Sequence, residues 1–210
     1  MSCDFTGYAD GFETSSYFRL PDFDYVPQYY KPSEEVLKYL DSRKIRVVPE
    51  FIVAPPHNDG VGFLQTHING QIIGLTQRMF NPFGENVRYI YQGRKGSYTG
   101  DISPFYKNNY PIVVFEKMFG MLRALTIATE RSIPLTLLSS NGSKLDYKFW
   151  NRFNPANLVF IMDNDMAGNS ARDFLRKLGF NAFSSRQETD MLGDNEMEKL
   201  LINAKSILLR

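Results

Sequence analysis

The sequence predicts an α/β protein in which a parallel sheet flanked by helices follows a smaller α+β part with a β-hairpin. Short unbroken apolar runs recur in the second half of the chain and have the length of buried parallel strands. Stretches in which apolar residues recur at helical spacing alternate with these runs. Further upstream, Asn69-Gly70 stands between two apolar-rich runs, which is typical of a hairpin turn. Strand and helix in repeated alternation favour a parallel sheet.

Residues 109–210 are expected to form the parallel sheet and its helices, together with a C-terminal helix. Strands are predicted at 111–115, 135–139, 158–162 and 181–185, and helices at 118–127, 144–153, 169–178 and 194–209. The run at 158–162 is apolar throughout, so this strand should be buried on both faces.

Residues 32–108 are expected to form a small N-terminal subdomain. Ser33 is suited to cap a helix whose first turn contains Glu34 and Glu35. The hairpin strands are predicted at 63–68 and 71–78, and a basic loop at 92–97 follows them.

Residues 1–31 are predicted to be an aromatic, acidic N-terminal arm. Prolines and the lack of a steady period argue against a regular element in this arm. One interpretation is an extended arm held on the main body by its aromatic side chains, and the other is a docking segment for a partner protein.

Composition limits the class of protein. The chain has 210 residues, of which 43% are apolar and 22% charged, as in ordinary globular proteins. A net charge of +1 means that any nucleic-acid binding must come from local basic patches. Cys3 is the single cysteine, so we expect no disulfide and no zinc bound within this chain. Neither a membrane span nor a signal peptide is recognisable, which predicts an intracellular, cytoplasmic protein without a membrane partner.

Acidic residues follow three of the four predicted parallel strands. Glu116 ends the first strand, Asp163 and Asp165 follow the third, and Asp190 follows the fourth. Ligands of open α/β sheets bind beyond the carboxyl ends of the strands. Carboxylates without neighbouring His or Cys favour Mg²⁺, with Mn²⁺ as an alternative. The competing interpretations are a helix cap and a turn for the aspartates, and a surface position for Glu116.

Basic and aromatic residues interleave between residues 71 and 110. The candidates for binding nucleic acid or nucleotide are Arg78, Arg88, Tyr89, Arg94 and Lys95. Basic groups contact phosphates, and aromatic rings stack on unpaired bases. The alternative is a solvated basic face without a ligand.

These residues resemble two motifs of the Toprim family, namely a glutamate at a strand end, here Glu116, and Asp163-x-Asp165-x-x-Gly168 before a helix. Upstream, Tyr39-Leu40-x-x-Arg43-x-Ile45, the hairpin and Arg78 are similar to the core of DnaG-like primases, in particular the phage type. The resemblance covers residues 32–190. The first motif departs from the family pattern Glu-Gly-x-x-Asp, because Lys117 and Gly120 stand where the family has glycine and aspartate.

The resemblance implies the catalytic core of a DNA primase. Such a nucleotidyltransferase is a DNA-directed RNA polymerase that uses Mg²⁺ to make RNA primers on single-stranded DNA during DNA replication. Glu116, Asp163 and Asp165 would then be catalytic and would hold the metal, with Asp190 as a further ligand. Arg78, Arg88 and Tyr89 match positions at which the family binds template or nucleotide.

The implied partners are single-stranded DNA and ribonucleoside triphosphates. A replicative helicase, a separate zinc-binding primase module, or both would complete the activity, and a phage-encoded chain would work in the cytoplasm of the host cell. Two alternatives remain open. One is a Toprim nuclease, because the same metal cluster serves phosphodiester hydrolysis. The other is a non-catalytic Toprim protein that binds nucleic acid or assists replication.

Overall fold

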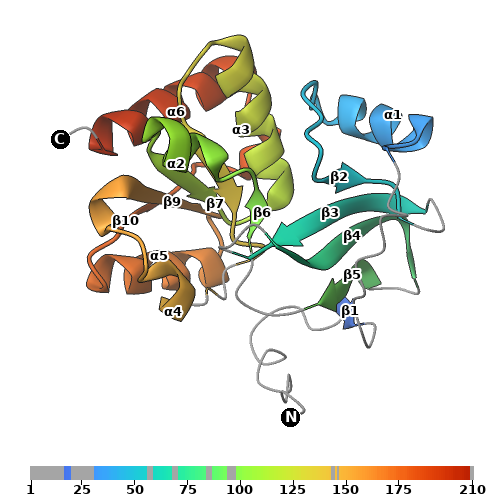
Figure 1. The fold of residues 1–210 in the computed structure, drawn as a ribbon, viewed down its shortest axis with the longest axis horizontal. Coiled ribbons are helices and arrows are strands. Elements are labelled where there is room, and N and C mark those ends of the chain that lie inside the picture. Colours follow the sequence, from blue (N-terminus) through green and yellow to red (C-terminus); the bar gives the residue numbers. More distant parts are fainter. Residues whose placement is uncertain are drawn as a thin grey trace.

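Two five-stranded sheets form the framework of the protein (Figure 1). The computed structural model describes residues 17–19, 31–55, 59–67, 71–83, 87–93, 98–142, 145 and 147–208. The first sheet has the order β1-β5-β4-β3-β2. Its strands are β1 (Tyr17–Arg19), β2 (Ile52–Val53), β3 (Gly60–Thr66), β4 (Ile72–Phe83) and β5 (Val87–Gly93). Strands β2 to β5 are antiparallel to their neighbours, whereas β1 runs parallel to β5.

The second sheet has the order β10-β9-β7-β8-β6. Four of its strands are parallel, namely β7 (Ile112–Phe115), β8 (Thr136–Ser139), β9 (Leu158–Met162) and β10 (Asn181–Ser184), and β6 (Thr99–Gly100) is antiparallel to β8. The helices are α1 (Glu34–Ser42), α2 (Ser103–Asn108), α3 (Met118–Glu130), α4 (Tyr147–Trp150), α5 (Met166–Lys177) and α6 (Asp194–Leu208), with short 3₁₀ turns η3 (Pro155–Asn157) and η4 (Thr189–Met191). A parallel sheet between helices, preceded by an antiparallel hairpin sheet, confirms the predicted fold class.

The central strand β7 is buried on both faces. Val113 and Phe115 pack into a core cluster with α3 and α6, while Ile112 and Val114 pack into a second cluster with α4 and α5. This alternation follows from the two-residue period of a strand. Figure 1 shows α3 and α6 on one side of this sheet and α5 on the other. Burial on both faces explains why the strand sequences are apolar throughout.

The chain reverses its direction of travel across the second sheet at β7. From β7 it moves to β8 on one side, and then it crosses to β9 on the other side of β7. Such a switch point opens a crevice at the carboxyl ends of the two strands. Because Phe115 is paired with Ile161, the residues that follow β7 and β9 lie next to each other.

The first sheet and α1 pack against α3, a helix that covers one face of the second sheet. Val36 and Leu40 of α1 belong to the same core cluster as Phe119 of α3, and the rings of Phe63 and Phe119 are 5.3 Å apart. The hydroxyl oxygen of Ser33 accepts a hydrogen bond from the backbone N–H of Val36 at 3.3 Å, which confirms the predicted cap of α1. The first sheet with α1 and the second sheet with α3 therefore share one hydrophobic core.

Several elements differ from the sequence-based expectation. Strand β1 lies in the arm that was predicted to contain no regular element, because the edge of β5 supplies backbone partners that no periodicity reveals. Strands β5 and β6 and helix α2 were not predicted, and β6 joins the second sheet ahead of the expected boundary at residue 109. Helix α5 begins at residue 166 rather than 169, and α4 spans only part of 144–153. The antiparallel pair β3–β4 is present as predicted, but the turn at 69–70 lies outside the described residues.

No helix in the described part of the chain has the length and apolar character needed to cross a membrane.

Candidate active site

Glu116 and Asp163 meet at the switch point between β7 and β9. The backbone N–H of Asp163 donates a hydrogen bond to Oε2 of Glu116 at 3.0 Å. Both residues are almost fully buried, with 4% and 2% of their surface exposed. The backbone N–H of Glu116 in turn donates to the carbonyl of Ile161 at 3.1 Å, which continues the pairing of β7 with β9. The sheet itself therefore holds the Glu116 carboxylate against the backbone of Asp163.

Asp165 lies in the same loop but its side chain serves helix α5. Its Oδ1 accepts a hydrogen bond from the backbone N–H of Gly168 at 2.7 Å, which makes Asp165 the N-cap of α5. Asp165 is exposed, in contrast to Asp163. A Cβ on Gly168 would lie 2.3 Å from the carbonyl oxygen of Asp163 and 2.9 Å from Oε2 of Glu116. Only glycine at this position lets the first turn of α5 approach the carboxylates so closely.

Lys117 brings a positive charge to the buried aspartate. Its Nζ lies 2.7 Å from Oδ2 of Asp163 and 3.7 Å from Oε1 of Glu188. The Lys117 side chain is 40% exposed, whereas the Asp163 side chain is 3% exposed, so the ammonium reaches the aspartate from the solvent side. The other oxygen, Oδ1 of Asp163, is buried and has no hydrogen-bond donor among the described residues.

Burial dominates the electrostatics of the carboxylates. It raises the pKa of Glu116 to about 7, against the hydrogen bond from Asp163, and the charges of Asp163 and Asp165 add to the increase. Burial also raises the pKa of Asp163, although Lys117 opposes the shift. The pKa of Lys117 is raised in spite of its own partial burial, because Asp163 binds the ammonium. The site therefore places negative charge where the folded protein disfavours it, which is a condition that a bound cation relieves.

Substituting Glu116 by glutamine is expected to change how stability depends on pH. The folded-state pKa of Glu116, about 7, lies above its ordinary value of 4.5. The contribution of the wild-type carboxyl group to the free energy of unfolding is therefore fully present below pH 4.5 and is lost as the pH rises through 7. Relative to wild type, E116Q should gain more than about 1 kcal/mol between pH 4.5 and pH 8.

Urea unfolding at the two pH values, with EDTA present, measures this difference. E188Q is the matched control, because Glu188 is 63% exposed. A stability difference between E116Q and wild type that is independent of pH would contradict the expected burial of the charge.

Asp190 is paired with an arginine of the first part of the chain. Its Oδ2 accepts a hydrogen bond from Nη1 of Arg43 at 2.8 Å. The Arg43 guanidinium also lies over the ring of Phe119, with its Cζ 4.5 Å from the ring centre, and 5.1 Å from that of Tyr39. Asp190 thus ties η4 to the end of α1 through an ion pair, and its predicted role as a metal ligand stays a prediction.

One predicted basic residue of the first sheet, Arg78, packs on the ring of Tyr89. The Cζ of Arg78 on β4 is 4.8 Å from the ring centre of Tyr89 on β5. Burial raises the pKa of the Tyr89 hydroxyl, and the positive charges of Arg78, Lys117 and Arg43 act on it in the opposite direction. Three positive charges therefore act on one tyrosine, and Arg78 also packs on its ring. The Nε of Arg78 is buried and finds no acceptor among the described residues.

Among the other predicted basic residues, Arg88, Arg94 and Lys95, the described part of the structure brings none to the site. Arg88 is exposed on β5, next to Tyr89 in sequence but on the opposite face of the strand. Arg94 and Lys95 lie outside the described residues.

The carboxylates fit a hard divalent cation in their chemistry. Glu116 and Asp163 offer oxygen ligands of the kind that Mg²⁺ prefers, and the unpartnered Oδ1 of Asp163 is the strongest structural indication of a missing positive partner. No three Asp, Glu, His or Cys side chains form a ready-made metal centre within the part of the chain that the structure describes. Asp165 would have to turn from its helix cap to join Glu116 and Asp163 at one ion.

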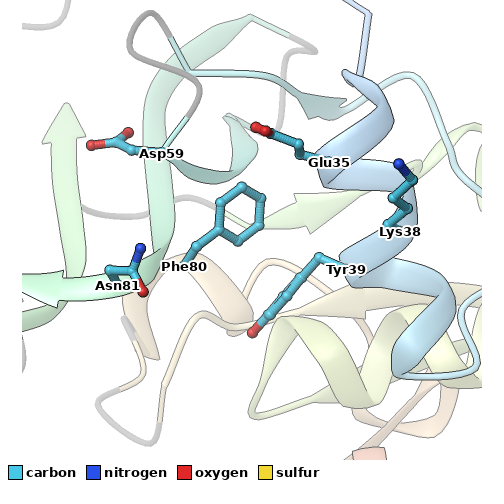
Figure 2. Close-up of a pocket in the computed structure, with 6 residues that line it drawn as sticks. All are labelled: Glu35, Lys38, Tyr39, Asp59, Phe80 and Asn81. Atoms are coloured by element: carbon cyan, nitrogen blue, oxygen red, sulfur yellow. The ribbon is translucent and has the colours of Figure 1, made fainter.

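A separate cavity of about 460 Å³ lies between α1 and the first sheet (Figure 2). Helix α1 contributes Glu35, Lys38 and Tyr39, and the sheet side contributes Asp59, Phe80 and Asn81. The rings of Tyr39 and Phe80 are 5.1 Å apart. This cavity contains none of the predicted carboxylates, and its two acids outnumber its one base, so it is not suited to a phosphate group.

Two residues of the site were not among the predicted site residues. Arg43 belongs to the Tyr39-Leu40-x-x-Arg43 segment, and Lys117 directly follows Glu116. Their places in the sequence could therefore have identified both as site residues. Gly120, which stands where the Toprim pattern has aspartate, packs against η4. A Cβ on Gly120 would lie 2.0 Å from Oγ1 of Thr189. The close approach of η4 to α3 therefore excludes a carboxylate at this position.

Comparison with known proteins gives matches at the level of structure. Neither the protein-family models nor the curated proteins match the sequence. A DnaG primase catalytic domain solved bound to ssDNA matches over 84% of this chain and 62% of that chain, with 16% identity and a TM-score of 0.53. The zinc-binding and RNA polymerase domains of the Aquifex aeolicus primase match over 84% and 50%, with 18% identity and a TM-score of 0.53.

The RNA polymerase domain of Mycobacterium tuberculosis primase DnaG, solved in complex with double-stranded DNA, matches over 81% of this chain and 61% of that chain, with 15% identity and a TM-score of 0.51. The chain spans between 50% and 62% of the length of these three structures. At such low identity the likeness concerns the fold. This chain has the fold of the catalytic cores of DnaG-type primases.

Proposed function

We propose that this chain is the catalytic core of a DNA primase that synthesises RNA primers on single-stranded DNA with Mg²⁺. The observation that carries the proposal is the buried Glu116–Asp163 pair at the switch point of a fold shared with primase catalytic cores. Glu116, Asp163 and Asp165 are the proposed catalytic and metal-binding residues. The phage type of this class, and a helicase or a separate zinc-binding primase module as partner, remain part of the proposal.

The chemistry needs positive charge around the transferred phosphate. Nucleotidyl transfer is an attack of a hydroxyl on an α-phosphate with loss of pyrophosphate, and Mg²⁺ supplies stabilisation of the attacking and leaving oxygens. Asp163 and Glu116 would hold the ion. The positive charges of Lys117, Arg43 and Arg78 all act on Tyr89 and would attract the triphosphate and the template. Tyr89 offers a ring beside Arg78 on which a base could stack.

Ribonucleotide incorporation on single-stranded DNA tests the proposal directly. We expect RNA products from labelled ribonucleoside triphosphates when Mg²⁺ is present and none when EDTA is added. The same labelled DNA, incubated without nucleotides, reports nuclease activity of the same metal cluster. Degradation of this DNA without RNA synthesis would overturn the primase proposal in favour of the nuclease, and the absence of both would favour a non-catalytic protein.

Replacing Arg78 by methionine is expected to weaken binding of single-stranded DNA. Its side chain is half-buried and its guanidinium lies over the Tyr89 ring, so that a phosphate and a stacked base could be bound together. Each phosphate that the variant no longer binds should reduce the slope of log K against log salt by about 0.7 for a single strand. Fluorescence anisotropy with an oligonucleotide at several salt concentrations measures both quantities.

The matched control is R131M. Arg131 follows the last residue of α3, whereas Lys117 precedes the first, so the control lies at the far end of this helix from the carboxylates. R131M should leave the slope unchanged. If R78M and R131M gave the same slope as wild type, Arg78 would not contact the template.

A further inference from the structure

Lys117 occupies a position that is electrostatically unfavourable for a lysine. It is the N-cap residue of α3, and its side chain makes no capping hydrogen bond. The N-terminus of a helix carries partial positive charge, which favours acidic and disfavours basic side chains. The opposing attraction comes from Asp163, 2.7 Å away, and more weakly from Glu188. The location of this ammonium is thus explained by the buried aspartate and not by the helix that Lys117 begins.

The two oxygens of Asp163 are used differently. Oδ2 forms an ion pair with Lys117 at 2.7 Å, whereas Oδ1 has no such cation, and neither buried oxygen accepts a hydrogen bond of good geometry within the described ranges. A carboxylate in this state can give one oxygen to a cation while the other stays bound to the ammonium. Glu188 is 63% exposed and lies 3.7 Å from Nζ of Lys117, so it offers the ammonium a second partner on the solvent side.

The charges of the site limit how many ions it can take. Once Asp165 leaves its helix cap, Glu116, Asp163 and Asp165 together carry three negative charges when ionised, and Lys117 supplies one positive charge; Glu188 is 63% exposed and is not counted. One divalent ion therefore neutralises the group, while a second would leave an excess of two positive charges beside Glu116 and Asp163, which are nearly buried. Such an uncompensated charge is costly away from water.

We propose that Lys117 is an internal cation of the carboxylate centre, which binds Oδ2 of Asp163, repels a divalent ion held by Oδ1 of the same carboxylate, and restricts the centre to a single, weakly held divalent ion. The inference rests on the proposed metal role of Glu116 and Asp163. It concerns a residue that replaces the glycine of the family's motif. Lys117 is in this sense a residue that sets metal affinity and stoichiometry.

Mn²⁺ binding to the full chain tests the inference without an activity assay. Titrations followed by the electron paramagnetic resonance signal of free Mn²⁺ give affinity and stoichiometry for wild type, K117M, K117Q and K117R. We expect one bound ion in wild type. Removing the charge in K117M or K117Q should tighten binding about tenfold, which is the scale of the repulsion between a divalent ion and an ammonium on one carboxylate at the dielectric of water. K117R retains the charge and should stay within about twofold of wild type by the same reasoning.

The control variant is K177M, which removes one positive charge from the exposed C-terminal end of α5. It should leave the affinity within about twofold of wild type, because charges beyond the Debye length are screened. Circular dichroism melting establishes that each variant is folded, and K117Q, which keeps a hydrogen-bond donor for Asp163, replaces K117M if the latter does not fold. The inference would be overturned if K117M and K117Q bound Mn²⁺ with the same affinity as wild type or more weakly. It would also be overturned if wild type bound no Mn²⁺ or bound two ions.

The outcome is separate from that of the primase assay. Tighter Mn²⁺ binding by K117Q in a protein that makes no RNA would support the role of Lys117 while refuting the proposed polymerase. RNA synthesis by wild type with unchanged Mn²⁺ affinity in K117Q would support the polymerase and refute the role of Lys117.

Discussion

Substitution of Asp163 by asparagine is expected to abolish Mg²⁺-dependent ribonucleotide incorporation. Asp163 is the most buried of the predicted carboxylates and presents the unpartnered oxygen at the switch point. An amide keeps the shape of the side chain but loses the negative charge that would hold the metal. Metal stabilisation of the transferring phosphoryl group is worth several kcal/mol, and therefore a loss of about a thousandfold in rate is expected. Single-turnover incorporation with wild type and D163N measures the ratio.

The fold of D163N should remain intact. Burial raises the pKa of Asp163, so the folded state disfavours its charged form, and an uncharged amide removes that cost at neutral pH. Asp173 provides the control, because it is exposed on α5 and pairs with Arg172. D173N should synthesise RNA at the wild-type rate. Wild-type activity in a folded D163N would remove Asp163 from the catalytic centre and with it the proposed polymerase.

The local features of the sequence were sufficient to predict the four parallel strands of the second sheet, although not β6. Strand β9 matches the predicted range 158–162, because its apolar run is bounded by Asn157 and Asp163. Local reasoning also places Glu116 and Asp163 at one edge of the sheet, since both residues follow parallel strands. Their adjacency depends in addition on the pairing of β7 with β9, which no short window of the sequence contains.

The side-chain partners could not be predicted in the same way. Asp163 and Asp165 are one residue apart, yet one lies buried beside Glu116 and the other caps α5, and this difference depends on where α5 begins. Arg43 and Asp190 form their ion pair across a separation of 147 residues, and β1 finds its partner at a sheet edge. Long-range pairings of this kind depend on the packing of α1 and η4 against α3, which no periodicity encodes.

A buried arginine on α3 provides the second large effect that we expect. Arg123 is fully buried and donates hydrogen bonds to the carbonyl of Lys44 at 2.7 Å, to the carbonyl of Leu192 at 3.1 Å, and to Oδ1 of Asp194 at 2.7 Å. Arg46 also binds Asp194, at 3.1 Å. Asp194 is therefore the carboxylate that neutralises Arg123 within the described residues, and it does so at a point where the segment after α1, helix α3 and helix α6 meet.

D194A should lower the free energy of unfolding by about 3 kcal/mol, because it leaves a buried guanidinium without a counter-charge. Urea unfolding at pH 7 measures the change. The matched control is E198A, four residues further along α6, since Glu198 pairs with Arg131, whose side chain is 50% exposed. An exposed pair of this kind contributes at most about 1 kcal/mol. Equal effects of D194A and E198A would contradict the argument that burial of the arginine decides the cost.

The same pair predicts a pH signature and a link to the active site. Arg123 lowers the pKa of Asp194 below its ordinary value of 3.8, so the stability from this pair is present above that value and is lost as the pH falls through the lower, folded-state pKa. The difference in unfolding free energy between wild type and D194A should consequently become smaller in acid. Lys44 follows Arg43, and Leu192 follows η4 with Asp190, so Arg123 holds the two segments that carry the Arg43–Asp190 pair. On heating, D194A should therefore lose RNA synthesis at the temperature at which it unfolds and retain it below, whereas D163N should be inactive at every temperature.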